Sequence, residues 1–191
     1  MIGNDIVDLQ LAAVQSNWRR KGFLDKVFTR YEQELIFNSA QPFLIVWRLW
    51  SMKESAYKMY TRQNGRRFFN PKKISCELIA EKRGRMIINT EKYVTQSLLK
   101  NNYIHTIASV ENCQKTHYRC FNIKNTSYIE QHRSCYQQVK NAISKRYELP
   151  VEKIQIQKNS KGIPQCYYHN KEFPVFLSIS HHGNYGAYAL K

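Results

Sequence analysis

A long stretch of uninterrupted helical pattern constrains the fold of this chain more than any other feature. Residues 47–58 contain neither glycine nor proline, and their apolar side chains recur at the spacing of one helix face. Trp50, Glu54 and Lys58 follow one another at intervals of four, so they lie on the same side of the predicted helix. Pro42 is expected to open this helix. Taken alone, the Glu-Lys pair indicates only a surface interaction worth about 0.3 kcal/mol.

The charge of the chain limits the partners that it can bind. It carries 30 lysines and arginines against 14 acidic residues, a formal net charge of +16 over 191 residues. Such a charge favours polyanionic partners, which include nucleic acid, an anionic membrane, a phosphorylated ligand or an acidic protein. The hydrophobic content of 42% is typical of a globular chain rather than a disordered one.

Cysteine usage and hydropathy predict a cytoplasmic protein. The five cysteines are odd in number and include no Cys-x-x-Cys pair, which indicates reduced thiols rather than a disulfide framework or a zinc site. No apolar run reaches the length of a membrane span, so no membrane partner is expected. The N-terminus, Met-Ile-Gly-Asn-Asp, lacks the basic and apolar regions of a signal peptide.

The chain opens on a predicted strand that carries two carboxylates. Within residues 2–9, Asp5 and Val7 share one face of the strand and Asp8 lies on the other. A buried carboxylate needs a cation or hydrogen-bond donors, because burying it bare is very costly. The simpler interpretation of such a residue is a cap on the following helix, which suits Asp8 better than Asp5.

The rest of the chain predicts two lobes, residues 1–125 and 126–191. The polar run 124–127 is taken as their boundary, and a helix followed by a hairpin occurs on each side of it. Before the boundary the patterns predict helices at 10–25, 29–38, 42–63 and 91–100, and strands at 74–79, 85–88, 103–110 and 117–123, with a hairpin turn at Arg83-Gly84. After it they predict a helix at 128–147 and strands at 150–157, 173–179 and 185–190.

Three separated motifs resemble those of the 4′-phosphopantetheinyl transferase superfamily. That family is marked by a Gly-x-Asp-Ile strand, a Trp-x-x-Lys-Glu-x-x-x-Lys helix and a Ser-x-Ser-His hairpin. The chain holds them as Gly3-Asn4-Asp5-Ile6, Trp50-Ser51-Met52-Lys53-Glu54-Ser55-Ala56-Tyr57-Lys58 and Ser178-Ile179-Ser180-His181. The helix motif is fairly specific, and all three together in one basic chain make a chance match improbable.

The resemblance implies an α+β protein with the 4′-phosphopantetheinyl transferase-like fold. Residues 3–79 look like the small holo-acyl-carrier-protein synthase type. Residues 128–190 look like the amino-terminal half of the larger, two-lobed type, so the lobes are permuted. The expected architecture is therefore two similar lobes, each a helix with an antiparallel sheet, that pair as a pseudo-dimer. Because one chain holds both lobes, the resemblance implies a monomer.

The activity that the resemblance implies is a magnesium-dependent transfer of phosphopantetheine. The group moves from coenzyme A to a serine of an acyl or peptidyl carrier protein, as in fatty acid biosynthesis. Asp5 and Glu54 would be the metal ligands, with phosphate oxygens and water completing the shell of Mg²⁺. Lys58 would contact a phosphate as a point charge, and either Glu54 or a metal-bound water would take the serine proton.

Two further sets of residues are implied by the same resemblance. The residues expected to contact coenzyme A are Lys58, Lys140, Lys145, Arg146, Lys161, Ser180 and His181. The residues expected to dock the acidic carrier protein are Arg19, Arg20 and Lys21. For the basic residues the alternative is a solvated charged face, and for His181 it is a turn histidine bonded to the backbone.

Two positions depart from the family pattern. Val7 stands where the larger type carries a second acid, which leaves Asp5 and Glu54 as the protein ligands. Ile163 stands where the family often has lysine between glycine and proline. One basic contact to the nucleotide is therefore either missing or supplied by Lys161.

Two other classes of function compete with the transferase. The charge and the 13 tyrosines also suit a nucleic-acid-binding module, but no recognised nucleic-acid motif is present, so no nucleic-acid partner is expected. A non-catalytic scaffold that binds carrier proteins is the second alternative, and Val7 and Ile163 are the residues that favour it.

Overall fold

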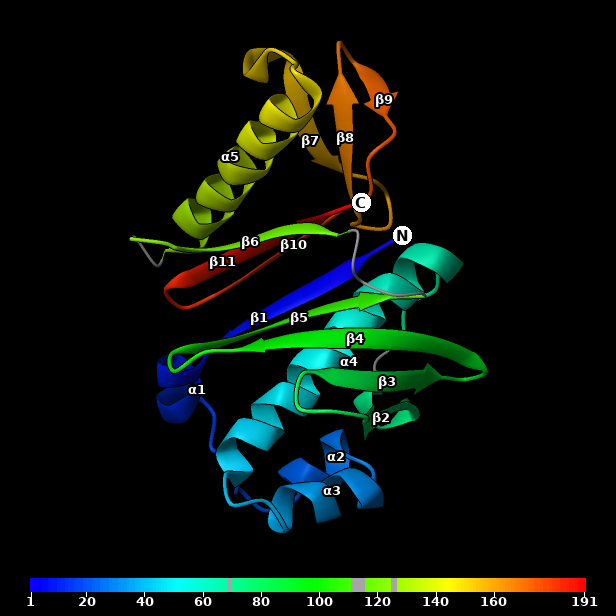
Figure 1. Ribbon diagram of the computed structural model, residues 1–191, viewed down its shortest axis with the longest axis vertical. Coiled ribbons are helices and arrows are strands. Elements are labelled where there is room, and N and C mark those ends of the chain that lie inside the picture. The colour runs from blue at the N-terminus through cyan, green and yellow to red at the C-terminus, as the bar shows by residue number, and fades with distance from the viewer. Residues whose placement is uncertain (69, 111–115, 125–126) are drawn as a thin grey trace.

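The computed structural model describes residues 1–68, 70–110, 116–124 and 127–191, and it is a mixed α+β structure. Its first half is built on a five-stranded antiparallel sheet with the strand order β1-β5-β4-β3-β2 (Figure 1). The strands are β1 (Gly3–Asp8), β2 (Ile74–Leu78), β3 (Arg83–Ile88), β4 (Glu91–Leu99) and β5 (Tyr103–Ser109). The α+β class that the sequence predicts is confirmed.

The central helix α4 (Pro42–Asn64) packs across one face of this sheet (Figure 1). Proline occupies its first turn, where a missing N–H costs nothing, and Gly65 ends it in the left-handed conformation. Leu49, Met52 and Ala56 are fully buried and contribute to the core of the first half. The predicted central helix is confirmed, and its apolar face explains its position.

Three short helices lie between β1 and α4 in the chain: α1 (Leu9–Gln15), α2 (Phe23–Val27) and α3 (Arg30–Phe37). Asp8 caps α1, since its carboxylate accepts from the N–H groups of Gln10 and Leu11. Thr29 and Glu32 form the predicted capping box at the start of α3. Both capping predictions are confirmed.

The second half contains one long helix and two small antiparallel sheets. Helix α5 (Tyr128–Tyr147) packs on the sheet β10-β11-β6 and on the strands beside it (Figure 1). The strands are β6 (His117–Asn122), β7 (Ile154–Lys158), β8 (Pro164–Tyr168), β9 (Lys171–Phe173), β10 (Leu177–His182) and β11 (Tyr185–Leu190), and β7-β8-β9 form the other sheet. Short 3₁₀ turns at Pro71–Lys73 and Val151–Lys153 lead into β2 and β7.

Strand β1 joins the two halves, because it lies between α4 and the β10–β11 hairpin. Gly3, Asp5 and Val7 lie on the face toward α4, and Asn4 and Asp8 bond to β10 and its turn. The division into lobes at 125 stays a prediction. Strand β6, which precedes that boundary, pairs with β11 of the second half.

One predicted helix, at residues 10–25, is wrong in its length. The structure has α1 ending at Gln15 and α2 starting at Phe23, with a loop between them. Gly22 in this loop has a φ of 78°, a backbone conformation that a continuous helix does not contain. The basic residues Arg19, Arg20 and Lys21 therefore lie on a loop rather than on a helix face.

The predicted helix near residues 91–100 is wrong, because this segment is the strand β4. Alternate residues of the strand, Tyr93, Thr95 and Ser97, are buried, and two of these three are the small polar residues threonine and serine. Burial therefore alternates along the strand with the period of two expected for a β-strand, but the hydropathy of the sequence does not, because the buried positions include polar residues. Ser97 and Thr106 share a hydrogen bond of 3.0 Å across the sheet, which makes burial of these hydroxyls tolerable.

Smaller corrections concern turns and strand limits. The β2–β3 hairpin is confirmed, but its turn precedes Arg83 and Gly84, which are the first residues of β3. The predicted strand at 173–179 is divided between the end of β9 and the start of β10, and β8 was not predicted at all. Among the helices of the described residues, none has the length and apolar composition needed to cross a membrane.

Candidate functional site

The glycine of the first motif lets β1 approach α4 closely. A side chain at position 3 would place its Cβ 2.1 Å from the Ser55 carbonyl oxygen and 2.9 Å from the Met59 nitrogen. Since backbone atoms cannot move aside cheaply, glycine is the residue that permits this contact. The contact brings Asp5, two residues further along the same strand face, against the middle of α4.

Asp5 lies in a polar contact with two residues of α4. Lys58 Nζ is 3.2 Å from Asp5 Oδ1, and Ser51 Oγ donates to the Asp5 carbonyl oxygen at 3.5 Å. Lys58 also donates to the Asn4 carbonyl oxygen at 2.9 Å. Burial raises the pKa of Asp5, and the nearby Lys58 ammonium offsets only part of that effect. The first and second motifs therefore meet at this ion pair.

Glu54 lies one helical turn before Lys58 and near Asp5. Burial and, after it, the negative charge of Asp5 raise the pKa of Glu54 to about 7, although Lys58 acts in the opposite direction. No hydrogen bond or ion pair to the Glu54 carboxylate occurs among the residues that the structure describes. A largely buried carboxylate without a donor is costly, so this side chain is suited to receive a cation or a proton.

The two carboxylates fit a divalent cation that takes most of its ligands from elsewhere. Mg²⁺ typically uses one or two protein carboxylates and completes its shell with phosphate oxygens and water. Within the described residues there is no cluster of three or more histidine, cysteine or acidic side chains that could hold a metal by themselves. Val7, at the position of the missing third acid, is buried in the core of the first half.

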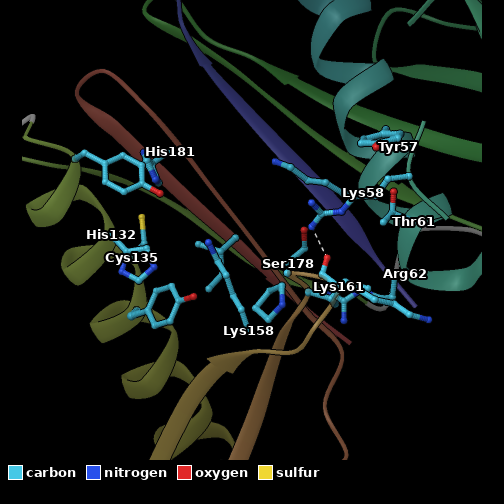
Figure 2. Close-up of a pocket in the computed structure, with 17 residues that line it drawn as sticks. Tyr57, Lys58, Thr61, Arg62, His132, Cys135, Lys158, Lys161, Ser178 and His181 are labelled. Atoms are coloured by element: carbon cyan, nitrogen blue, oxygen red, sulfur yellow. Dashed lines mark hydrogen bonds between the residues drawn. The ribbon is translucent and has the colours of Figure 1, made fainter. Parts of the chain in front are cut away.

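A cavity of about 330 Å³ opens beside Lys58, between α4, α5, β10 and the turn that joins β7 to β8 (Figure 2). Five cationic side chains line it, and none of its described lining residues is acidic. These cations are Lys58, Arg62, Arg67, Lys158 and Lys161. Such a lining attracts an anion with several charges, because Lys58 alone of the five has an ion pair, with Asp5, among the described residues.

Two of these cations are held in place by backbone carbonyls. Arg62 donates to the Leu177 carbonyl oxygen at 2.5 Å, and burial lowers its pKa to about 10. Arg67 donates to the Lys161 carbonyl oxygen, which ties the loop after α4 to the β7–β8 turn (Figure 2). The cavity is therefore bounded by segments from both halves of the chain.

The third motif contributes Ser178 and His181 to the cavity. Burial lowers the pKa of His181, and the neighbouring Lys58 lowers it further, so the ring is neutral at pH 7. Ser180 points instead toward β1, where it accepts from the Asn4 amide at 2.9 Å. His182 also has a structural contact, since its Nδ1 accepts from the Asp8 N–H at 2.9 Å.

Aromatic side chains of α5 form the wall opposite Lys58 and Arg62 (Figure 2). His132 stacks on Tyr136 with ring centroids 4.0 Å apart, and Tyr128 contacts His181 edge-to-face at 5.7 Å. Burial and the nearby Lys158 lower the pKa of His132. A flat ring system could stack on this wall while its phosphates face the cations.

The structure brings some of the predicted site residues together and separates others. Asp5, Glu54 and Lys58 lie close together where β1 meets α4, and Lys58, Lys161 and His181 share the cavity. Lys145 and Arg146 line a different hollow with Arg119, and Lys140 is not in the lining of the cavity. Arg19 and Arg20, on the loop after α1, lie over the rings of Trp18 and of Phe23, the first residue of α2.

Several cavity residues were missed from the sequence, namely Arg62, Arg67, His132, Lys158 and Ser178. Arg62 had a readable signal, because it follows Lys58 by four residues on the same face of α4. The others depend on the packing of the two halves, which local spacing does not encode. Lys161 was predicted from the Gly162-Ile163-Pro164 motif beside it, but Lys158 was indistinguishable from the other lysines of a chain with a charge of +16.

Comparison with known proteins identifies the class. The family model of the 4′-phosphopantetheinyl transferase superfamily matches residues 1–108, which include the first two motifs and the whole five-stranded sheet except the end of β5. The chain belongs to this superfamily, whose members transfer phosphopantetheine and use coenzyme A with carrier proteins. A search among curated proteins finds no match to the chain.

Proposed function

We propose that this protein is a 4′-phosphopantetheinyl transferase that modifies a serine of an acyl or peptidyl carrier protein in a Mg²⁺-dependent reaction. One observation carries the proposal. The Asp5, Glu54 and Lys58 group stands at the edge of a cavity that is lined by five cations and no described acid. Coenzyme A brings a pyrophosphate and a 3′-phosphate, which are the groups that such a cavity would hold.

The proposed chemistry is a displacement at phosphorus. The carrier serine oxygen forms a bond to the pyrophosphate phosphorus that bears the pantetheine arm, and the bond from that phosphorus to the bridging oxygen breaks. Adenosine 3′,5′-bisphosphate leaves with the electron pair. When bound at Asp5 and Glu54, Mg²⁺ would stabilise the charge that builds on the departing phosphate. Lys58 would neutralise a phosphate oxygen on the cavity side.

The serine proton requires an acceptor near the metal position. Glu54 is one candidate, because it is a carboxylate beside Asp5 without a hydrogen-bond donor among the described residues, and in the metal-free protein its pKa is raised to about 7. A water held by the same carboxylates is the alternative acceptor. We also propose the cytoplasm as the location, because Cys76, Cys120, Cys135 and Cys166 are free thiols.

The proposed carrier-docking surface consists of the loop residues Arg19, Arg20 and Lys21. These side chains are exposed, and the neighbouring Val14 on α1 is 80% exposed. Leu11 and Val14 share a shallow hollow with His181, which also lines the cavity. An acidic helix that binds there would have apolar contacts and cations close to the reacting groups. Coenzyme A contacts by Lys140, Lys145 and Arg146 have less support, because they lie outside the cavity lining.

The test of the proposal is the binding of coenzyme A, measured by isothermal titration calorimetry with and without Mg²⁺. We expect binding that Mg²⁺ strengthens in the wild type but not in Glu54→Gln, which keeps the size of the side chain. A single-stranded oligonucleotide serves as the competing polyanion. Tight oligonucleotide binding without any binding of coenzyme A would overturn the proposal in favour of a nucleic-acid module.

A further inference from the structure

Asn4, the variable residue of the first motif, has contacts that its position in a strand does not require. Its side chain is fully buried, and the residue bonds to four other residues: its main-chain N–H and carbonyl oxygen contact Ser178 and Lys58, and its side-chain Nδ2 contacts Ser180 and His105. The partners belong to α4, β5 and two positions of β10, so one residue contacts all three motif segments. The proposed chemistry above assigns no role to it.

The first set of contacts runs from Asn4 to the hairpin motif on β10. The Asn4 N–H donates to Ser178 Oγ at 2.9 Å, and Asn4 Nδ2 donates to Ser180 Oγ at 2.9 Å. These two serines lie on either side of Ile179, and Ser180 directly precedes His181. Because Ser178 and His181 line the cavity, the contacts fix the position of that cavity wall relative to β1.

The second set of contacts runs from Asn4 to Lys58 on α4 and to His105 on β5. The Asn4 carbonyl oxygen accepts from Lys58 Nζ at 2.9 Å, which holds the ammonium next to Asp5. Asn4 Nδ2 also lies 3.2 Å from Nε2 of His105. Burial lowers the pKa of His105 to about 3, so its ring is neutral and its nitrogen can accept from the amide.

The Asn4 side chain buries a polar atom without a partner in the described part of the chain, which destabilises the fold in a way that an apolar residue would not. Asn4 Oδ1 is buried and has no hydrogen-bond partner among the described residues. A leucine, which has the same branched shape but a larger volume, would leave no orphaned carbonyl oxygen. A local departure from good packing of this kind is expected where a residue serves a site rather than the stability of the fold.

We infer that Asn4 is a positioning residue: its main chain holds Lys58, and its side chain ties the Ser178–His181 wall of the cavity to the same strand, so that the two sides form one binding site for the pyrophosphate-containing donor. The inference rests on the proposed function. It assigns Asn4 no contact with the donor or with the reacting atoms. The effect of its side chain passes through Ser180, which directly precedes His181, whereas the contacts with Lys58 and Ser178 are made by the main chain and remain in a substitution at position 4.

The experiment compares Asn4→Leu with the wild type in steady-state transfer and in titration with coenzyme A. We expect the KM and the dissociation constant for coenzyme A to rise about tenfold, the loss expected for about 1.4 kcal/mol of hydrogen bonding. The KM for the carrier should stay unchanged. The matched control is Ile6→Val, which removes a buried methylene group from the same strand. It should lower the melting temperature without changing either KM.

A second arm tests whether Asn4 acts through Ser180. Adding Ser180→Ala to Asn4→Leu should weaken coenzyme A binding little further, because the contact between them is already lost. Multiplicative effects of the two substitutions would overturn the inference, as would an Asn4→Leu protein that melts earlier but binds coenzyme A normally. If the wild type binds coenzyme A but transfers nothing, the proposed function is contradicted. The dissociation constants of the wild type and Asn4→Leu for coenzyme A would still test the inference on Asn4.

Discussion

Two glutamates of this protein show how the same side chain is used in two ways. Glu32 is fully buried and has three partners: Lys53 Nζ at 2.8 Å, the Thr29 N–H at 2.8 Å and the Cys76 N–H at 2.7 Å. Glu54 follows Lys53 directly and has no such partner among the described residues. The satisfied carboxylate stabilises the fold, whereas the unsatisfied one is available for a ligand.

This contrast predicts opposite results for two conservative substitutions. Glu32→Gln removes the charge that compensates Lys53 in the core, so we expect it to destabilise the fold by about 3 kcal/mol or more. Glu54→Gln removes a poorly solvated charge, so it should leave the stability equal or higher while abolishing transfer. Urea unfolding and a transfer assay on both variants measure this. Equal destabilisation by the two substitutions would contradict the contrast.

The raised pKa of Glu54 predicts a pH dependence of stability in metal-free protein. In the unfolded chain Glu54 loses its proton near pH 4.5, whereas in the folded protein it keeps it up to about pH 7. The folded state therefore binds more protons between these values, and its stability must fall as the pH rises through this window. Thermal melts in EDTA should show this fall. Excess Mg²⁺ or Glu54→Gln should reduce it, and an unchanged slope in Glu54→Gln would assign the effect to another group.

At the scale of the elements, the contact between β1 and α4 determines the site. Gly3→Ala would place a Cβ 2.1 Å from the Ser55 carbonyl oxygen and force the strand away from the helix. We expect a loss of about 1–3 kcal/mol in the free energy of unfolding and a weaker response of the melting temperature to Mg²⁺. A Gly3→Ala protein with normal stability and a normal Mg²⁺ response would show that the close approach is unnecessary.

Elements with strong local signals could be predicted from the sequence, and elements shaped by tertiary contacts could not. Helix α4, the Thr29–Glu32 capping box and the opening strand were predicted because caps, spacing and β-branched residues determine them locally. Strand β4 was read as a helix because its buried face carries Thr95 and Ser97, whose polar side chains mask the alternating pattern. Ser97 finds its hydrogen-bond partner, Thr106, only across the sheet on β5. Spacing alone could not reveal such a partner.

The residues of the candidate site also fall into those that could be predicted from the sequence and those that could not. Asp5, Glu54 and Lys58 could be singled out because each lies in a motif whose spacing is readable. Arg67 and Lys158 could not, because they approach the cavity from loops and strand ends that meet only when the two halves pack. Lys145 and Arg146 were expected beside the donor, but α5 directs them into another hollow. A helix about 30 Å long has room for more than one such surface.

At the scale of the whole molecule, the charge of +16 predicts how the carrier protein is recognised. Arg20→Glu on the proposed docking loop should raise the KM for an acidic carrier severalfold and leave the KM for coenzyme A unchanged. Lys92→Glu on the exposed side of β4 changes the net charge by the same amount and is the matched control. If both variants raise the KM for the carrier equally, net charge rather than the loop is responsible.

The most direct measurement is intact-mass spectrometry of an apo carrier protein incubated with this protein, coenzyme A and Mg²⁺. We predict that the carrier gains the mass of one phosphopantetheine, and that Asp5→Ala and Glu54→Ala abolish the gain. Acyl and peptidyl carriers should be tested in parallel, since the site residues do not choose between them. An unchanged mass across all carriers, with wild-type protein that is folded and binds them, would contradict the transferase and favour a carrier-binding scaffold.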